Sequence, residues 1–447
     1  MTPMARLPAP PLAWQLRHAR EMMFRLYAVL PELARRHGPV FEIGRPGPVR
    51  FVCLLGAEAN ELLLAGNPSN FLWRDMTAPL IPVDGDTALV VSDGEDHRRR
   101  RRLVQPAFSR KRIEGYLPIA VEEVVAAVER WRPGDAIDVH AELRACVRRI
   151  VIRSLFGDRL RDRATELGDL LQPALDYVNR PFPLRFDHDL PGTAFRRAMA
   201  ARRRADEIVF AEIAERRDRP DDGGDVLAAL LDAQEQGERL TDQEVRDQVI
   251  SLIAAGYDTT SAGIAWAVHA LYSRPDVLDA ARAEVAEVVG DDPLTADHLA
   301  DLPYLGAVVS ESLRLWPPGP LSGRRAIESF DFAGHRIPGG RLVLYSPYVT
   351  HRLPDLWPEP ERFLPERWIP GSPHHREPVP YSFVPFGGGY RRCIGFALAT
   401  METTAMLAEL VRRVDLRPHA RELEPVGLVT MAPKGGVVCT VAPRPAA

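Results

Sequence analysis

Apolar residues recur every three to four positions through the middle of the chain, which is the period of an amphipathic α-helix. The segments with this period are 111–131, 138–157, 163–178, 194–217, 224–236 and 242–272. Short alternating or apolar stretches at about 38–58, 325–346 and 427–442 favour strands. Helices between two strand-rich ends do not form the repeating βαβ pattern of a parallel sheet. The pattern predicts a mainly α protein with a smaller β portion (α+β), in which 1–447 forms a single large domain, α-rich over about 59–317 and 394–415.

The longest helical segment, 242–272, is interrupted by residues that suit a helix poorly. It opens with a capping box from Thr241 to Glu244, and its 31 residues would span roughly 45 Å. Its centre reads Ala255-Gly256-Tyr257-Asp258-Thr259-Thr260, although glycine costs about 1 kcal/mol inside a helix and a buried Asp needs a partner. This local conflict marks a candidate site. The alternative is a helix that packs closely at Gly256.

Cys393 lies between a glycine-rich run and a helical segment. The sequence Phe386-Gly387-Gly388-Gly389-Tyr390-Arg391-Arg392-Cys393-Ile394-Gly395 is followed directly by FALATMETTAMLAELVRRV. Backbone N–H groups and a helix N-terminus near the sulfur would lower the thiol pKa and favour a metal-binding thiolate. The glycines would let the backbone approach a flat partner closely. The alternative is a buried structural cysteine beside a glycine turn.

Composition and charge exclude several other classes of protein. Hydrophobic residues make up 46% and charged residues 26% of the chain, and the formal net charge of −4 gives no general attraction to nucleic acid. The four cysteines lie far apart with no C-x-x-C pair, which argues against a zinc site or a disulfide scaffold. We find no signal peptide and no apolar stretch long enough for a membrane anchor, so we expect a cytoplasmic protein.

The spacing F-x-x-G-x-R-x-C-x-G around Cys393 resembles the haem-binding loop of the cytochrome P450 family. The resemblance implies the cytochrome P450 fold, with haem b between the long central helix and the cysteine loop. Cys393 would be the axial ligand of the haem iron. The flanking cofactor-binding residues would be Phe386, Gly387 and Gly395.

The interrupted centre of the long helix resembles the oxygen-activating segment A/G-G-x-D/E-T of the same family. On this resemblance Ala255 and Gly256 would line the oxygen pocket, and Asp258 and Thr259 would be the catalytic residues that deliver protons. Peroxide-using members typically lack the acid–alcohol pair. Its presence favours a monooxygenase that uses dioxygen and electrons.

The E-x-x-R pair Glu311 and Arg314 occupies one face of a helix that stops before two prolines. It resembles the family's buried Glu–Arg pair, which a third arginine completes. Arg362 and Arg367 both lie in a P-E-R element, and the F-x-P-E-R-F spacing that starts at Phe363 favours Arg367. This structural network would fix the cysteine loop through bidentate contacts.

An arginine run at 98–102 follows His97, and one such run in a net acidic chain is typical of a solvated helix face. The resemblance assigns His97 and Arg101, four positions apart, to the haem propionates. Arg391 would be a further donor, and so would Arg324, with Arg325 as the competing choice. The hypothesis for the other basic residues is an outward docking surface for an acidic electron donor; these are Arg98, Arg99, Arg102, Arg110, Lys111, Arg112 and Arg392.

The implied activity is hydroxylation or epoxidation of a lipophilic small molecule such as a terpenoid, fatty acid or polyketide. No flavin or iron–sulfur motif is visible, so we expect a ferredoxin or flavodoxin with an NAD(P)H reductase, and a monomer. The expected pocket walls are 76–91, 170–186, 254–260, 318–323 and 429–431. The alternatives are rearrangement chemistry on the same fold, or a non-enzymatic haem-thiolate sensor or electron carrier.

Overall fold

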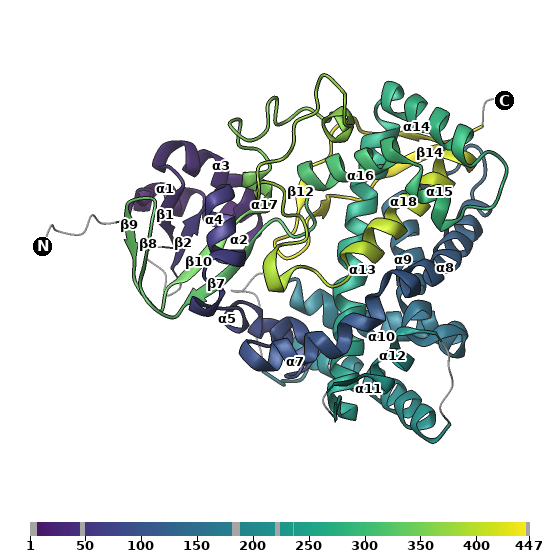
Figure 1. Cartoon of the computed structure of the whole chain (residues 1–447), viewed down its shortest axis with the longest axis horizontal. Coiled ribbons are helices and arrows are strands. Elements are labelled where there is room, and N and C mark those ends of the chain that lie inside the picture. The colour runs from purple at the N-terminus through teal and green to yellow at the C-terminus, as the bar shows by residue number, and fades with distance from the viewer. Residues whose placement is uncertain (1–6, 45–49, 181–187, 220–223, 236, 444–447) are drawn as a thin grey trace, which may run out of the picture.

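The computed structural model describes residues 7–44, 50–180, 188–219, 224–235 and 237–443. Helices dominate it, as Figure 1 shows. The α-helices are α1 Leu12–Arg17, α2 Ala19–Phe24, α3 Leu26–His37, α4 Ala57–Glu61, α5 Arg74–Thr77, α6 Ile81–Asp84, α7 Gly94–Val104, α8 Arg110–Val128, α9 Val139–Phe156, α10 Ala164–Val178, α11 Ala194–Asp218, α12 Val226–Asp232, α13 Asp242–Tyr272, α14 Pro275–Val288, α15 Ala296–Ala300, α16 Pro303–Leu315, α17 Pro347–Thr350 and α18 Phe396–Arg413. Within the described ranges, no helix combines the length and apolar character needed to cross a membrane.

Strands from residues 40–72 and from residues 322–345 meet in one main sheet, and the other strands pair in smaller sheets. Its order is β1-β2-β10-β7-β3, in which β10 runs parallel to β2 and the other neighbours are antiparallel. This sheet lies at one side of the molecule with α1 to α4, and the longer helices fill the other side (Figure 1). The strands are β1 Val40–Ile43, β2 Phe51–Leu54, β3 Phe71–Leu72, β4 Ala136–Asp138, β5 Gln234–Glu235, β6 Glu238–Arg239, β7 Ser322–Ala326, β8 Phe330–Phe332, β9 His335–Ile337, β10 Leu342–Tyr345, β11 Asp415–Pro418, β12 Pro425–Val426, β13 Ala432–Pro433 and β14 Val438–Ala442.

The helical segments predicted from periodicity are confirmed within a few residues at each end, as α8 to α13. The predicted strand pair within 427–442 is wrong in its pairing. β13 pairs with β12, whereas β14 pairs with β11 and β4. Strands of two to four residues carry too little alternation to be detected from sequence. Residues 45–49, 181–186 and 236 of the predicted segments lie outside the described residues.

Helix α13 is the central element of the fold. The predicted capping box is present, with the Thr241 side chain accepting from the Glu244 N–H and the Glu244 carboxylate accepting from the Thr241 N–H. The helix packs against α9, α16 and α18, so residues along it meet elements from distant parts of the sequence. Because α18 begins three residues after Cys393, this packing brings the cysteine loop to the central helix.

A buried acid on α18 predicts a pH-dependent stability. Glu402 is 1% exposed, and burial raises its pKa to about 8. This folded-state pKa exceeds the value of about 4.3 in an unfolded chain. The contribution of protonated Glu402 to the free energy of unfolding is therefore complete below about pH 4.3 and is lost as the pH rises to about 8.

Glu402→Gln is therefore expected to unfold with a free energy on the order of 3 kcal/mol higher than the parent protein near pH 7.5, and with little difference near pH 4.5. Urea unfolding at a series of pH values measures this. Glu422→Gln, at an exposed position, should follow the parent curve. If the free energies of unfolding of Glu402→Gln and the parent differ by the same amount at every pH, the raised pKa of Glu402 is refuted.

Candidate active site

The cysteine loop is held by hydrogen bonds within its own backbone. The Cys393 N–H donates to the Phe386 carbonyl at 2.9 Å, and the Gly387 N–H donates to the Val384 carbonyl at 3.0 Å. Gly389 has a φ of +59°, and a Cβ there would lie 2.0 Å from the Leu64 carbonyl oxygen. Only glycine fits this position. At Gly387 a Cβ would have no heavy atom closer than 3.9 Å, so this stretch of backbone leaves room for a flat partner.

The Cys393 side chain has accessible surface, although the surrounding protein partly desolvates its thiol. The expectation of a lowered thiol pKa is wrong for the protein without a metal. Burial raises the pKa of Cys393, and the opposing effects of the Gly395 N–H, Arg101 and Arg392 are smaller. An uncompensated thiolate is costly in such a site, so the thiolate requires a cation to bind to.

The centre of α13 also carries accessible surface. Ala255 is exposed, and Gly256, Asp258 and Thr259 are partly exposed, although most of the helix from Thr260 to Tyr272 is buried. The Thr259 hydroxyl donates to the Ala255 carbonyl at 2.6 Å, which takes that carbonyl into a side-chain hydrogen bond. A side chain at Gly256 would point to Val151 of α9 at 3.5 Å, so Gly256 could line a pocket only with its backbone.

Asp258 is clamped from two other helices. Arg144 of α9 donates to its Oδ1 at 2.8 Å, and Asn179, just after α10, donates to its Oδ2 at 3.1 Å. Gln172 of α10 accepts from both Arg144 and Tyr257. Sequence reasoning missed Arg144, Asn179 and Gln172, because nothing in their local sequence distinguishes them from other helical polar residues.

Four predicted donors gather beside the cysteine loop. His97 and Arg324 are each 2% exposed, and His97 lies edge-on to Tyr390 of the loop. Arg391 forms an ion pair with Asp93, and it lies close enough to His97 to lower the pKa of that imidazole. Burial is the main cause of this shift and takes the His97 pKa to about 3, so its ring is neutral. The charge of Arg101 lies close enough to interact with the Cys393 thiol and with the Arg391 guanidinium.

Trp73 links the two arginines that come from the sheet and the loop. The Arg324 guanidinium lies 3.8 Å from the centroid of the indole, and that of Arg391 lies 5.5 Å away. The Trp73 N–H of the backbone donates to Asp93, the partner of Arg391. Sequence reasoning missed both Trp73 and Asp93, although the Ser-Asp-Gly sequence at 92–94 is typical of a helix start.

This cluster contains donors and charges that the described residues do not satisfy. Four buried side-chain nitrogen atoms have no hydrogen-bond partner there: His97 Nδ1, Arg324 Nη2, Arg391 Nε and Trp73 Nε1. Arg101, Arg324 and Arg391 bring three positive charges against the one carboxylate of Asp93. The excess of two positive charges fits a ligand with two carboxylates.

The competing residue Arg325 points elsewhere. It forms an ion pair with Asp75 at 2.9 Å and donates to the Gly340 carbonyl, and both side chains of the ion pair are more than a third exposed. Arg324, its neighbour on β7, is buried against Trp73. The alternation of side chains along the strand places these two arginines on opposite faces of the sheet.

The Glu311 carboxylate is the centre of a buried network. It accepts two hydrogen bonds of 2.8 Å from Arg314, one of 3.3 Å from Arg367 and one of 3.0 Å from the Trp368 indole. Glu311 and Arg314 are both 0% exposed. The competing residue Arg362 is exposed and pairs with Glu359. Arg314 also donates to the carbonyls of His351, Pro360 and Arg362, so the network ties α16 to the segment before the cysteine loop.

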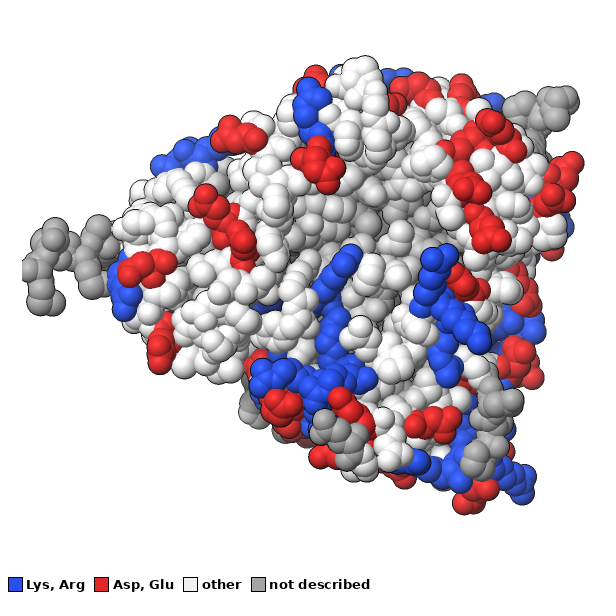
Figure 2. All heavy atoms as spheres, viewed as in Figure 1, with Lys and Arg blue, Asp and Glu red and all other residues white. Residues whose placement is uncertain are grey.

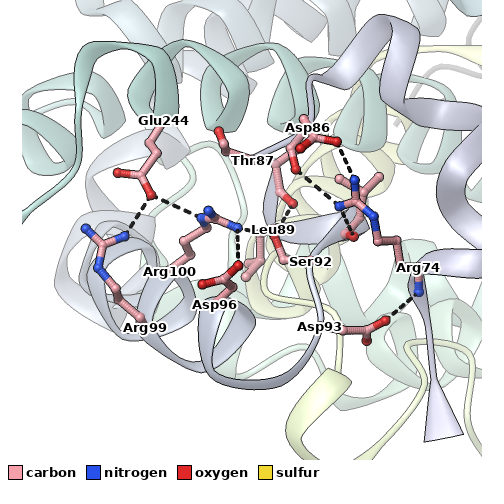
Figure 3. A network of polar contacts seen from close by, with 12 residues as sticks. Arg74, Asp86, Thr87, Leu89, Ser92, Asp93, Asp96, Arg99, Arg100 and Glu244 are labelled. Atoms are coloured by element: carbon pink, nitrogen blue, oxygen red, sulfur yellow. Dashed lines mark hydrogen bonds and ion pairs between the residues drawn. The ribbon is translucent and has the colours of Figure 1, made fainter. Parts of the chain in front are cut away.

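The arginine run of α7 is less free than expected. Arg99 and Arg100 both donate to Glu244, in the first turn of α13, at 2.7 and 3.1 Å, and Arg100 also donates to Ser92 (Figure 3). Arg98 pairs with Glu95, and Arg102 pairs with Glu235. On the face shown in Figure 2, Asp and Glu side chains lie among the Lys and Arg side chains of its lower part.

The hypothesis of a docking surface for an acidic electron donor stays a prediction, because ion pairs within the fold lower the net charge of these residues without excluding such a surface. Arg110 also pairs with Glu114, and Arg112 donates to the Gly224 carbonyl. Carboxylates reduce the positive potential that a run of arginines would otherwise create. The run mainly fastens α7 and the segment before it to the start of α13.

An accessible cysteine beside a glycine turn, donors for two carboxylates and an interrupted central helix are together the features of a haem-thiolate protein. The family model for cytochrome P450 matches residues 7–440, so the chain belongs to the cytochrome P450 family and is a cytochrome P450 monooxygenase.

Among its relatives is cytochrome P450 139 of Mycobacterium tuberculosis, 44% identical over 402 residues, which cover 90% of this chain and 93% of the relative. Another is cyclooctat-9-en-7-ol 5-monooxygenase of Streptomyces melanosporofaciens, 36% identical over 388 residues, which cover 86% and 83%. The structure of a cyanobacterial cytochrome P450 with retinoic acid bound has a TM-score of 0.86 at 26% identity, covering 98% of this chain and 99% of that one. The predicted family and fold are confirmed.

Proposed function

We propose that this monooxygenase holds haem b through Cys393 and oxidises a lipophilic terpenoid-like molecule with electrons from a separate redox protein. The observation that carries the proposal is the set of four partnerless buried nitrogen atoms and two excess positive charges beside an accessible cysteine. Protoporphyrin has two propionates, which match both the charge and the donor chemistry. When bound, haem would supply the activation of dioxygen that the protein side chains cannot provide.

The residues divide into groups with different tasks. His97, Arg101, Arg324 and Arg391 would hold the propionates, and Trp73 would keep the guanidinium groups of Arg324 and Arg391 in place. Phe386, Gly387 and Gly395 would provide the backbone around the ligand. Glu311, Arg314 and Arg367 would keep that loop fixed from behind, without contact with the substrate.

Asp258 and Thr259 would move protons to the oxygen-binding side. The Thr259 hydroxyl can accept a proton from one side while donating to another acceptor, and its contact with the Ala255 carbonyl keeps it on the partly exposed face of α13. The Asp258 carboxylate would receive protons from solvent when Arg144 and Asn179 release it. Ala255 is small enough to leave space beside the helix.

The substrate class rests on the relatives and on apolar segments. The Streptomyces relative acts on cyclooctat-9-en-7-ol, a terpenoid alcohol, by its name. The segments 76–91, 254–260 and 318–323 are mostly apolar and would line the pocket, whereas 181–186 lie outside the described residues. A cyclic terpenoid would bury its surface well against such walls.

A substrate screen tests the proposal directly. Cyclic terpenoid alcohols should shift the spin state of the ferric haem on binding and should raise NADPH consumption in the presence of a ferredoxin or flavodoxin with its reductase. Formation of a hydroxylated or epoxidised product in step with NADPH consumption supports the proposal. If the protein binds only fatty acids or polyketides from the panel, the terpenoid class is refuted.

Asp258→Asn is expected to lower the turnover rate by about 10²–10⁴, because the amide cannot carry a proton. Haem content and substrate affinity should stay within about twofold of the parent, since the amide can still accept from Arg144. Steady-state product formation and the solvent isotope effect measure the change. Asp176→Asn, an exposed carboxyl on α10 that accepts from Gln172, is the matched control and should keep the parent rate. Equal turnover of Asp258→Asn and the control would contradict the role.

A further inference from the structure

His351 is a fully buried imidazole between the Glu311 network and the cysteine loop. It follows α17 directly and is 0% exposed. Its ring packs against Phe383, with centroids 5.3 Å apart, and lies edge-on to Trp357. Neither the motif around Cys393 nor the E-x-x-R pair includes it. Its surroundings are apolar rings apart from the two hydrogen bonds and the arginines Arg314 and Arg352.

Both ring nitrogens of His351 are engaged with backbone groups. The Val384 N–H donates to Nε2 at 2.9 Å, so Nε2 is the unprotonated acceptor. Nδ1 lies 3.1 Å from the Arg314 carbonyl, and a carbonyl only accepts, so Nδ1 carries the proton. Burial, followed by the Arg314 charge, lowers the His351 pKa to about 3. The ring is therefore neutral, with its tautomer fixed.

The contact with Arg314 is reciprocal. The Arg314 guanidinium donates to the His351 carbonyl at 2.8 Å while the His351 ring donates to the Arg314 carbonyl. The same guanidinium holds both oxygens of Glu311. The position of the imidazole is thus set by the most deeply buried ion pair described in the fold.

A short series of hydrogen bonds leads from the imidazole to the cysteine. Val384, held by His351 through its N–H, offers its carbonyl to the Gly387 N–H and so closes the turn 384–387. Phe386 lies in this turn, and its carbonyl accepts from the Cys393 N–H. His351 therefore acts on the backbone from which the Cys393 side chain projects, three hydrogen bonds away.

We propose that His351 is a positioning residue for Cys393: its neutral imidazole joins the Arg314 carbonyl to the Val384 N–H and so fixes the turn that sets the cysteine backbone. This inference rests on the proposed role of Cys393 as the iron ligand. Substitution of His351 by an apolar residue leaves the buried Val384 N–H and the buried Arg314 carbonyl without the imidazole as their partner. A turn released in this way loses its hold on the Cys393 backbone, and the thiolate bond to iron becomes easier to lose.

The experiment compares His351→Leu, His351→Gln and His269→Leu in the haem-loaded protein. The glutamine amide carries both a donor and an acceptor and can restore the bridge. His269 of α13 is the matched control, because it is another buried histidine whose burial lowers its pKa, but its ring contacts Ser273 and not the loop. The readouts are the rate at which the reduced carbon monoxide complex changes from its thiolate to its thiol band, and the haem reduction potential.

We expect His351→Leu to lose the thiolate band about tenfold faster than the parent and to shift the reduction potential. His351→Gln should stay within about threefold of the parent, and His269→Leu should lower the melting temperature without changing either readout. The parent rate in His351→Leu, or equal acceleration in the two leucine variants, would overturn the inference.

Two further outcomes are decisive. If His351→Leu gives no folded protein, a glutamine variant with the parent rate and potential supports the bridge, and one with a fast loss of the band overturns it. Failure of both His351 variants to fold would place the residue in general folding and would also overturn the inference. A parent protein without any thiolate band would instead refute the proposed role of Cys393.

Discussion

Cys393→Ser is expected to abolish the thiolate band of the reduced carbon monoxide complex. A serine hydroxyl is not ionised near neutral pH and cannot supply the anionic ligand of a haem-thiolate iron. Because burial raises the Cys393 pKa in the protein without haem, we also expect haem binding to release a proton. Absorption spectra of the reduced complex and measurement of the protons released during haem addition test the two expectations.

Cys146→Ser is the matched control for this change. Burial raises the pKa of Cys146 as well, to about 11, but Cys146 has no accessible surface, and its thiol lies 3.6 Å from the Glu123 carbonyl, which a hydroxyl can also reach. This variant should keep the full band. A thiolate band that survives in folded Cys393→Ser, or that disappears in folded Cys146→Ser, would show that another cysteine binds the iron.

Glu311→Leu is expected to lower the free energy of unfolding by about 3–5 kcal/mol and to reduce haem retention. It leaves the buried guanidinium groups of Arg314 and Arg367 without the carboxylate that they share, and an unpaired buried charge carries a cost of this size. The Leu364 N–H and the Trp368 indole lose their acceptor as well. Urea unfolding of the haem-loaded protein and haem content after dialysis measure the two effects.

The control for Glu311→Leu is Glu166→Leu. Glu166 also pairs with an arginine, Arg163, at 2.9 Å, but both side chains are 48% exposed. Exposed pairs contribute about 1 kcal/mol or less, so the control should be nearly neutral. Similar losses of stability in both variants would mean that the Glu311 carboxylate is not the centre of the network.

The sequence predicts the features that depend on local patterns. Apolar periodicity was sufficient for α8 to α13, and the spacing from Phe363 was sufficient to choose Arg367, which contacts Glu311, over Arg362, which lies in solvent. Both depend on residues that lie close together in the chain. Of the two neighbours on β7, Arg324 is buried, whereas the Arg325 side chain is more than a third exposed.

The remaining features depend on contacts between distant segments. Arg144 and Asn179 clamp Asp258 across separations of 114 and 79 positions, and no local pattern encodes such pairings. Arg99 and Arg102 of the arginine run likewise pair with acidic residues more than 130 positions away, Glu244 and Glu235. The Cys393 pKa was misjudged because loop geometry favours the thiolate, whereas burial, invisible in the local sequence, opposes it more strongly.

The excess positive charge around Trp73 has a consequence for the order of assembly. Arg324 comes from the sheet, Arg391 from the cysteine loop and Arg101 from α7, so three separate parts of the chain must converge on one spot. Before the propionates arrive, these parts repel one another. The newly made chain should therefore close this junction last, and added salt should favour the closed form of the empty protein more than that of the loaded one.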